Sequence, residues 1–349
     1  MKTINQNIRN LSLDELQDFL IKNNEKPFRA KQVYEWLWVK SAKSFDEMTN
    51  ISLQVRELLK KHFIIPALTV HSMQISSDKT IKTAFKLFDE QLVEGVLIPL
   101  ADRMTACISS QAGCAMNCNF CATGQYGYKR SLSFDEIYDQ VAWLNQLGMK
   151  HYAHHLTNIV FMGMGEPLMN YVNVIKSIEK ITSENGLGIS PKRITLSTVG
   201  IADKIRKLGD DMVKFNLAIS LHSANNNKRS SIVPINRKFS LSVLSEAILY
   251  FYSKTNSRLT YEYILFNDFN DSIQDAKELV EFCKITPCKI NLIEYNQVQS
   301  LPFKKTSYDR LHKFAEYLEG KNLVINIRKS RGADIQAACG QLAGEINQQ

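Results

Sequence analysis

The chain has 349 residues, of which 44% are hydrophobic and 22% charged, a balance typical of a globular protein with a sizeable core. Lys and Arg outnumber Asp and Glu by 43 to 35, and the resulting net charge of +8 favours a polyanionic partner such as nucleic acid. No apolar run approaches the ~20 residues of a membrane-spanning helix and the start lacks a secretory pattern, so we expect a cytoplasmic protein without membrane contact.

The first part of the chain reads as a series of short helices. Ser12 with Glu15, and Ser44 with Glu47, have the spacing of capping boxes that open helices. Further apolar residues recur at helical spacing, with basic residues on the other faces. We therefore predict a helical accessory domain over residues 1–66, and its basic helices are candidates for holding RNA.

The second part alternates apolar and polar residues, which predicts a β-rich extension over residues 67–102. From residue 103 the pattern changes to strand, loop and helix, repeated to the end. The strand candidates are "RMTACISS", "NIVFMGM", "RITLSTV", "FNLAISLH", "RLTYEYILF", "KINLIEYN" and "LVINIRKS". The helical patterns between them lie at 133–148, 170–184, 201–209, 240–255, 272–285 and 306–320.

This alternation predicts an α/β fold over residues 103–349, with a parallel sheet covered by helices. Six or so units are too few for a closed eight-fold barrel. A partial (β/α)6 barrel fits the count better than a doubly wound sheet, although periodicity does not separate the two. In either architecture ligands bind at the carboxyl ends of the strands.

Three cysteines, Cys114, Cys118 and Cys121, follow the first of these strands with the spacing C-x3-C-x2-C. A structural zinc site needs four ligands, and ferredoxin motifs have other spacings and supply four thiolates per cluster. Three thiolates suit a 4Fe–4S cluster that keeps one iron open for another ligand. Two alternatives are a chance grouping of buried cysteines and a zinc-stabilised RNA-binding protein with a distant fourth ligand.

The cysteine motif resembles that of the radical S-adenosyl-L-methionine (SAM) superfamily. The resemblance implies a partial (β/α)6 barrel and one 4Fe–4S cluster held by Cys114, Cys118 and Cys121. It also implies that the open iron binds SAM and that the reduced cluster cleaves SAM to a 5′-deoxyadenosyl radical. Such chemistry requires a reductant, for example flavodoxin or ferredoxin.

Several strand ends carry glycine or short polar residues suited to binding SAM. In "FMGMGEPLMN", Gly163 and Gly165 allow close backbone approach and Glu166 offers a carboxylate, which matches the superfamily motif for the SAM amino group. The polar residues after later strands suit a ribose and a carboxylate. Together, the residues that match SAM contacts of one family are Gly165, Glu166, Ser197, Ser220, Leu221, His222 and Asn296.

The segment "SRGADIQAACGQLAGE", which contains Cys339, points to that family. Together with "CNFCATGQ", "MGMGEP" and "SLHS", it resembles the RlmN/Cfr family of radical SAM RNA methyltransferases over residues of about 90–345. The resemblance implies that Cys339 takes a methyl group from one SAM and that a second SAM activates this methyl group for addition to adenine. It further implies that Cys107 resolves the adduct through a transient disulfide bond and that Glu94 accepts the ring proton.

Two residues bear on the branch of the family. Pro167 and Gln125 resemble the branch that methylates carbon 2 of an adenosine in 23S rRNA and of the adenosine 3′ of the anticodon in some tRNAs. The alternative is the Cfr-type branch, which methylates carbon 8 of the same rRNA adenosine. A radical SAM enzyme for a peptide or metabolite is a further alternative. The segment 126–130, "YGYKR", suits stacking and phosphate contact with RNA, and we expect a monomer.

Overall fold

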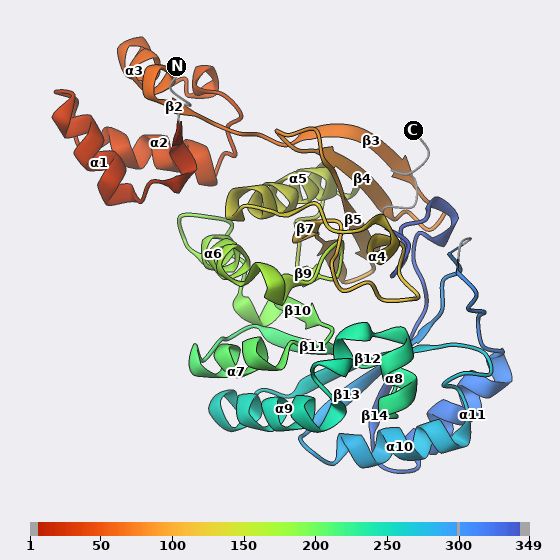
Figure 1. The fold of residues 1–349 in the computed structure, drawn as a ribbon. Coiled ribbons are helices and arrows are strands. Elements are labelled where there is room, and N and C mark those ends of the chain that lie inside the picture. Colours follow the sequence, from red (N-terminus) through yellow and green to blue (C-terminus); the bar gives the residue numbers. More distant parts are fainter. Residues whose placement is uncertain (1–5, 299–300, 343–349) are drawn as a thin grey trace.

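The computed structural model describes residues 6–298 and 301–342. A small helical unit comes first and projects from one end of the molecule (Figure 1). It consists of helices α1 (Leu13–Lys22), α2 (Arg29–Trp38) and α3 (Leu53–His62), with a short parallel pair of strands, β1 (Gln6–Asn7) and β2 (Phe63–Ile64). The predicted helical start is therefore confirmed, and the predicted domain boundaries at residues 66 and 102 stay predictions.

The two predicted capping boxes have different outcomes. At α1 the Ser12 side chain accepts a hydrogen bond from the Glu15 amide, and the Glu15 carboxylate accepts one from the Ser12 amide, as expected. The second prediction was wrong, because residues Phe45–Glu47 form only a single 3-10 turn and the Ser44 side chain makes no capping hydrogen bond. The apolar spacing needed to extend that turn into a helix is missing after Met48.

A curved ten-stranded sheet forms the centre of the molecule, in the order β14-β13-β12-β11-β10-β9-β6-β5-β4-β3. Its first strands, β3 to β6, pair antiparallel, and β6 and β9 to β14 pair parallel. The antiparallel strands are β3 (Thr69–Ile75), β4 (Ile81–Lys86), β5 (Leu92–Leu100) and β6 (Arg103–Cys107). The further parallel strands are β9 (Asn158–Phe161), β10 (Ile194–Thr198), β11 (Asn216–Ser220), β12 (Leu259–Leu265), β13 (Cys288–Glu294) and β14 (Val324–Arg328).

One long helix joins each parallel strand to the next and covers the outer side of the sheet (Figure 1). These helices are α5 (Phe134–Tyr152), α6 (Tyr171–Thr182), α7 (Ala202–Asp210), α9 (Leu241–Thr255), α10 (Ile273–Cys283) and α11 (Tyr308–Glu319). Because β14 and β3 are the two edges of this sheet, the barrel is open, which confirms the partial barrel. In the part of the chain that the structure describes, no helix has both the length and the hydrophobicity to cross a bilayer.

The helical unit is attached to the barrel through α5. Arg9, which is buried, forms an ion pair with Asp139 of α5 at 2.6 Å between Nη1 and Oδ2. The ring of Trp38 stacks on Phe134, with 5.6 Å between the ring centroids. The buried Tyr138 hydroxyl also donates to the Trp38 carbonyl oxygen. These contacts between buried side chains hold the unit in a defined place beside the barrel.

Candidate active site

Two cavities follow one another along the inner face of the barrel. We call them the carboxyl-end cavity, of about 140 Å³, and the amino-end cavity, of about 500 Å³. Their order is clear on β12, where alternate residues face inward. Thr260, early in the strand, lines only the amino-end cavity, whereas Ile264, late in the strand, lines only the carboxyl-end cavity. Glu262, between them, lines both.

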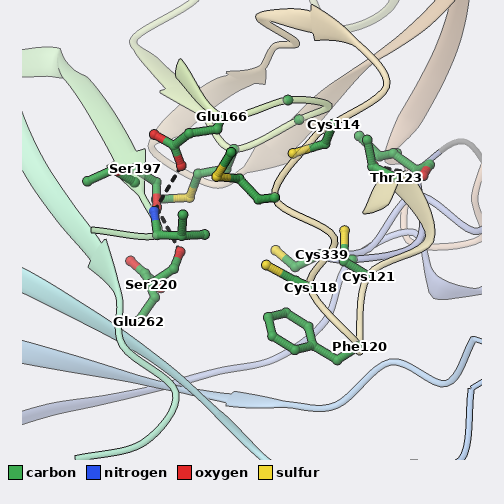
Figure 2. Close-up of a pocket in the computed structure, with 18 of the residues that line it drawn as sticks. Cys114, Cys118, Phe120, Cys121, Thr123, Glu166, Ser197, Ser220, Glu262 and Cys339 are labelled. Atoms are coloured by element: carbon green, nitrogen blue, oxygen red, sulfur yellow. Dashed lines mark hydrogen bonds between the residues drawn. The ribbon is translucent and has the colours of Figure 1, made fainter. Parts of the chain in front are cut away.

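Cys114, Cys118 and Cys121 lie on the loop after β6, and all three line the carboxyl-end cavity (Figure 2). Cys118 is buried and the other two are half-buried. Burial raises the pKa of Cys114 to about 12 and raises that of Cys118 well above its usual value. Such thiols ionise only beside a cationic partner, so the donor set fits an iron–sulfur cluster.

The C-terminal segment is hydrogen-bonded to the cysteine loop. The Ala122 amide donates to the Gly340 carbonyl at 2.8 Å, and the Thr123 hydroxyl donates to the Leu342 carbonyl at 3.0 Å. These two bonds bring Cys339 into the carboxyl-end cavity, where Figure 2 shows it together with the loop cysteines. Cys339 also lines the amino-end cavity, so it lies where the two cavities meet.

The turn after β9 requires glycine. Gly165 has a φ of +94°, which side chains rarely allow, and a Cβ atom there would lie 2.5 Å from Cβ of Gln111. The Gln111 side chain accepts a hydrogen bond from the Glu166 amide at 2.9 Å. The glycine therefore lets the turn approach the cysteine loop closely and directs Glu166 into the carboxyl-end cavity.

Glu166 is a buried carboxylate held by the backbone. Its two oxygens accept hydrogen bonds from the amides of Leu168 at 3.0 Å and Val199 at 2.9 Å. Burial raises its pKa to about 7, and these hydrogen bonds counteract the rise. A buried carboxylate of this kind is complementary to an ammonium group.

Three further predicted residues line the same cavity: Ser197, Ser220 and His222. The Ser197 and Ser220 hydroxyl oxygens are 3.2 Å apart. Burial, together with the charge of Arg229, lowers the pKa of His222 to about 3. Its ring is therefore neutral, and Nδ1 accepts a hydrogen bond from the Ile264 amide at 3.2 Å.

Four predicted residues lie elsewhere. Leu221 is fully buried and lies outside both cavity linings. Asn296 lines the amino-end cavity, where its Nδ2 donates to the Cys339 carbonyl at 3.4 Å. Cys107 also lines the amino-end cavity, together with Cys339. Glu94 is buried on β5 outside both linings, with 3.7 Å between its Oε1 and Nζ of Lys82.

The segment 126–130 contacts protein where the sequence suggested contact with RNA. The Arg130 guanidinium forms ion pairs with Asp89 at 2.6 Å and with Glu136 at 2.8 Å. Two carboxylates thus balance its charge, and contact of Arg130 with an RNA phosphate stays a prediction. Tyr128 is exposed, so stacking on RNA stays a prediction for that ring.

Sequence reasoning missed Arg229, a fully buried arginine on α8 (Asn226–Ile232) beneath the site. Its guanidinium donates to the carbonyls of Leu221, Val199 and Ser220 at 3.1, 2.6 and 3.3 Å. It also donates to Oδ1 of Asn236 at 2.7 Å. Nothing in the sequence distinguished this arginine from an exposed basic residue. It joins the ends of two strands that carry site residues.

We expect Arg229→Met to lower the free energy of unfolding by about 3–5 kcal/mol, because it leaves several buried carbonyls without a donor. Urea denaturation followed by circular dichroism would measure the loss. Arg237→Met, at an exposed position, is the matched control and should change stability by less than about 0.5 kcal/mol. Equal stability of the two variants would show that the Arg229 hydrogen bonds contribute little.

Comparisons with known proteins agree with this site. Residues 6–65 match the family model "Ribosomal RNA large subunit methyltransferase N-terminal domain", and residues 108–283 match "Radical SAM superfamily". A probable dual-specificity RNA methyltransferase RlmN of Cytophaga hutchinsonii is 57% identical over 336 residues, covering 96% of this chain and 92% of that protein. The dual-specificity RNA methyltransferase RlmN of Geobacter sulfurreducens is 42% identical over 340 residues, which cover 97% of this chain and 92% of that protein.

A solved structure is also similar over nearly its whole length. The crystal structure of a radical SAM methyltransferase from Sphaerobacter thermophilus has a TM-score of 0.92 at 36% sequence identity. The match covers 97% of this chain and 99% of the Sphaerobacter thermophilus chain. With the cysteine loop, the glycine turn and the open barrel in place, these findings show that the chain belongs to the RlmN family of radical SAM RNA methyltransferases.

Proposed function

We propose that this chain methylates carbon 2 of adenosine in 23S rRNA and in a subset of tRNAs, with Cys339 as the methyl carrier. One observation carries the proposal: Cys339 lines the cavity of the three loop cysteines and also the cavity that contains Cys107. A sulfur in that place contacts a methyl donor on one side and a methyl acceptor on the other. The printed names of the relatives, which are dual-specificity RNA methyltransferases, support the substrate class.

Different residues of the carboxyl-end cavity would bind different parts of the cluster and of SAM. Cys114, Cys118 and Cys121 would hold a 4Fe–4S cluster, which with bound SAM supplies the methyl group and the radical that activates it. The Glu166 carboxylate would accept hydrogen bonds from the amino group of SAM. The neighbouring Ser197 and Ser220 hydroxyls can donate to or accept from a ribose or carboxylate. The enclosing side chains, Phe120 among them, exclude water from this space.

The two cysteines that meet in the amino-end cavity would carry the methyl group and release the product. The Cys339 thiolate accepts a methyl group, which becomes a thioether on the protein. After that carbon has joined the base, the Cys107 thiolate would attack the Cys339 sulfur. The carbon–sulfur bond would break as the disulfide forms, and the released carbon would keep that electron pair and take up a proton to become the methyl group. Glu94 stays our prediction for the acceptor of the ring proton, although it lies outside both linings. A flavodoxin or ferredoxin is the proposed electron donor.

The preference for carbon 2 rests on Pro167 and Gln125. Pro167 opens the short 3-10 helix Pro167–Asn170 directly after Glu166. Gln125 lies in α4 (Ala122–Tyr126), within the same loop region as the three cysteines. Pro167 lines the carboxyl-end cavity, whereas Gln125 is exposed and lies outside both linings. Carbon 8 is the alternative outcome.

The deciding experiment is mass spectrometry of nucleosides from ribosomal RNA and tRNA of a strain that lacks this gene. We expect 2-methyladenosine to disappear from both RNAs and to return when the wild-type gene is restored. Loss of 8-methyladenosine in its place would assign the chain to the carbon-8 branch. Unchanged levels of both nucleosides would contradict the proposed function.

Metal analysis gives an independent test of the cysteine loop. Protein purified without oxygen should be brown and contain about four iron and four sulfide per chain. The triple variant in which Cys114, Cys118 and Cys121 are replaced by alanine should contain neither. Colourless wild-type protein with one zinc per chain would support the RNA-binding alternative.

A further inference from the structure

The amino-end cavity has no assigned ligand, yet its walls are those of a binding site. Its volume of about 500 Å³ falls within the range of small-molecule sites, roughly 300–1,000 Å³. Three exposed cations line its solvent side, Arg103, Lys289 and Lys329. Amide side chains line its interior. Parallel barrels usually bind ligands at the carboxyl ends of their strands, while packed side chains fill the rest of the interior. A cavity of this size at the amino ends of the strands is therefore unexpected.

A chain of polar side chains crosses the wall of this cavity. Nδ2 of Asn326 donates to Oδ1 of Asn291 at 3.1 Å, and Nδ2 of Asn291 donates to Oε1 of Glu262 at 2.7 Å. The three residues lie at neighbouring positions of β14, β13 and β12, and Asn291 is paired with Glu262 and Asn326 in the sheet. Each amide is therefore oriented, and the Glu262 carboxylate is fixed in one rotamer by its partners.

The second oxygen of Glu262 is the unusual atom. The Glu262 side chain is only 5% exposed, and within the described residues its Oε2 has no hydrogen-bond partner. Nη1 of Arg328 lies 3.5 Å from Oε2. Burial raises the pKa of Glu262, and Arg328 and Asn291 counteract the rise. Oε2 therefore has Arg328 as an ion-pair partner but accepts no hydrogen bond, which leaves it able to accept one from a ligand.

The positions of Cys107 and Cys339 indicate which ligand the amino-end cavity binds. The acceptor carbon must reach the sulfur of Cys339, and the product must leave while Cys107 approaches that sulfur. Both cysteines line the amino-end cavity, and the loop cysteines line only the other one. The target base therefore belongs in the amino-end cavity, after extrusion from the RNA stack.

We propose that the amino-end cavity binds the extruded target nucleotide and that Oε2 of Glu262 accepts a hydrogen bond from the exocyclic amine of its adenine. This inference rests on the proposed function and names a residue that determines specificity within it. Adenine carries an amine donor at carbon 6, whereas guanine and hypoxanthine carry a carbonyl oxygen there, which the carboxylate repels. The exposed cations at the cavity's solvent side are placed to contact the flanking phosphates.

The test compares stem-loop RNAs that differ only at the target nucleotide, which is adenosine, purine riboside without the amine, or inosine. Binding to cluster-containing protein is measured by fluorescence anisotropy without SAM. We expect the wild type to bind the adenosine RNA about 10- to 100-fold more tightly than the purine riboside RNA, as for a hydrogen bond to a charged group. In Glu262→Gln this preference should fall to about 3-fold or less, and binding of the inosine RNA should improve, because the new amide can donate to the carbonyl.

Glu294→Gln is the matched control, since Glu294 ends the neighbouring strand β13 and lies outside both linings. It should keep the wild-type preference. Equal affinity of the wild type for the adenosine and purine riboside RNAs, or an unchanged preference in Glu262→Gln, would overturn the inference. Methylation of Cys339, read by mass spectrometry of the protein after incubation with SAM, separates this failure from failure of the proposed function. It should occur in the wild type and in Glu294→Gln, and its absence from the wild type would mean that the function itself is wrong.

Discussion

Cys339→Ala is expected to lower the rate of RNA methylation by about 10³-fold or more, because alanine has no sulfur to carry the methyl group. The variant should still cleave SAM to 5′-deoxyadenosine when reduced, since the three loop cysteines and Glu166 are unchanged. Labelled SAM and a stem-loop RNA would measure both quantities in one reaction. The two readouts together separate loss of the carrier from loss of the cluster.

The control for this variant is Cys283→Ala. Cys283 is buried at the end of α10 and lies outside both cavities, so its replacement tests the cost of losing a buried cysteine. It should keep methylation within about 2-fold of the wild type. Wild-type rates in Cys339→Ala would remove the carrier role and with it the two-cavity mechanism.

Cys107→Ala should stall the first turnover at the RNA adduct, with product release slowed by about 10²-fold or more. Without the Cys107 sulfur nothing attacks the carrier, so the RNA stays joined to the protein through the carbon on Cys339. A denaturing gel with labelled RNA would show this adduct as a slowly migrating protein band. The band should be missing in the double variant of Cys107 and Cys339.

The outcome that contradicts this prediction is repeated turnover of Cys107→Ala without any adduct. Cys288→Ala is the matched control, because Cys288 is likewise a buried cysteine at a strand position, here on β13. It lies outside both linings and should leave no adduct. The comparison shows whether the effect belongs to the Cys107 sulfur or to any buried cysteine.

The order of strands and helices was predictable because its signals are local. Each parallel strand is a short apolar run and each covering helix has its own periodic apolar face, so neither requires knowledge of distant residues. The grouping of the loop cysteines was equally accessible, since all three lie within one short segment. The capping box at Ser12 formed, whereas the one at Ser44 did not, because a cap stabilises a helix only where the following residues continue it.

The division of the site into two cavities was not predictable from the sequence. Asn296, which stays a prediction as a SAM contact, lies in the amino-end cavity beside Cys339, a position that the sequence did not indicate. Which end of the barrel a residue faces depends on strand register, which is set by pairing with distant strands. The burial of Arg229 likewise depends on carbonyls at the ends of two different strands. The sequence contained one indication that Glu262 is unusual, because it is an acidic residue in the middle of a mostly apolar strand.

The hydrogen bonds from Ala122 and Thr123 to the backbone just after Cys339 have a consequence for damage by oxygen. Under the proposed function, loss of the metal centre in air would loosen the loop and, with it, the anchorage of Cys339. Both proposed steps would then stop together, and an oxidised molecule would not trap RNA in a linkage that it could no longer complete.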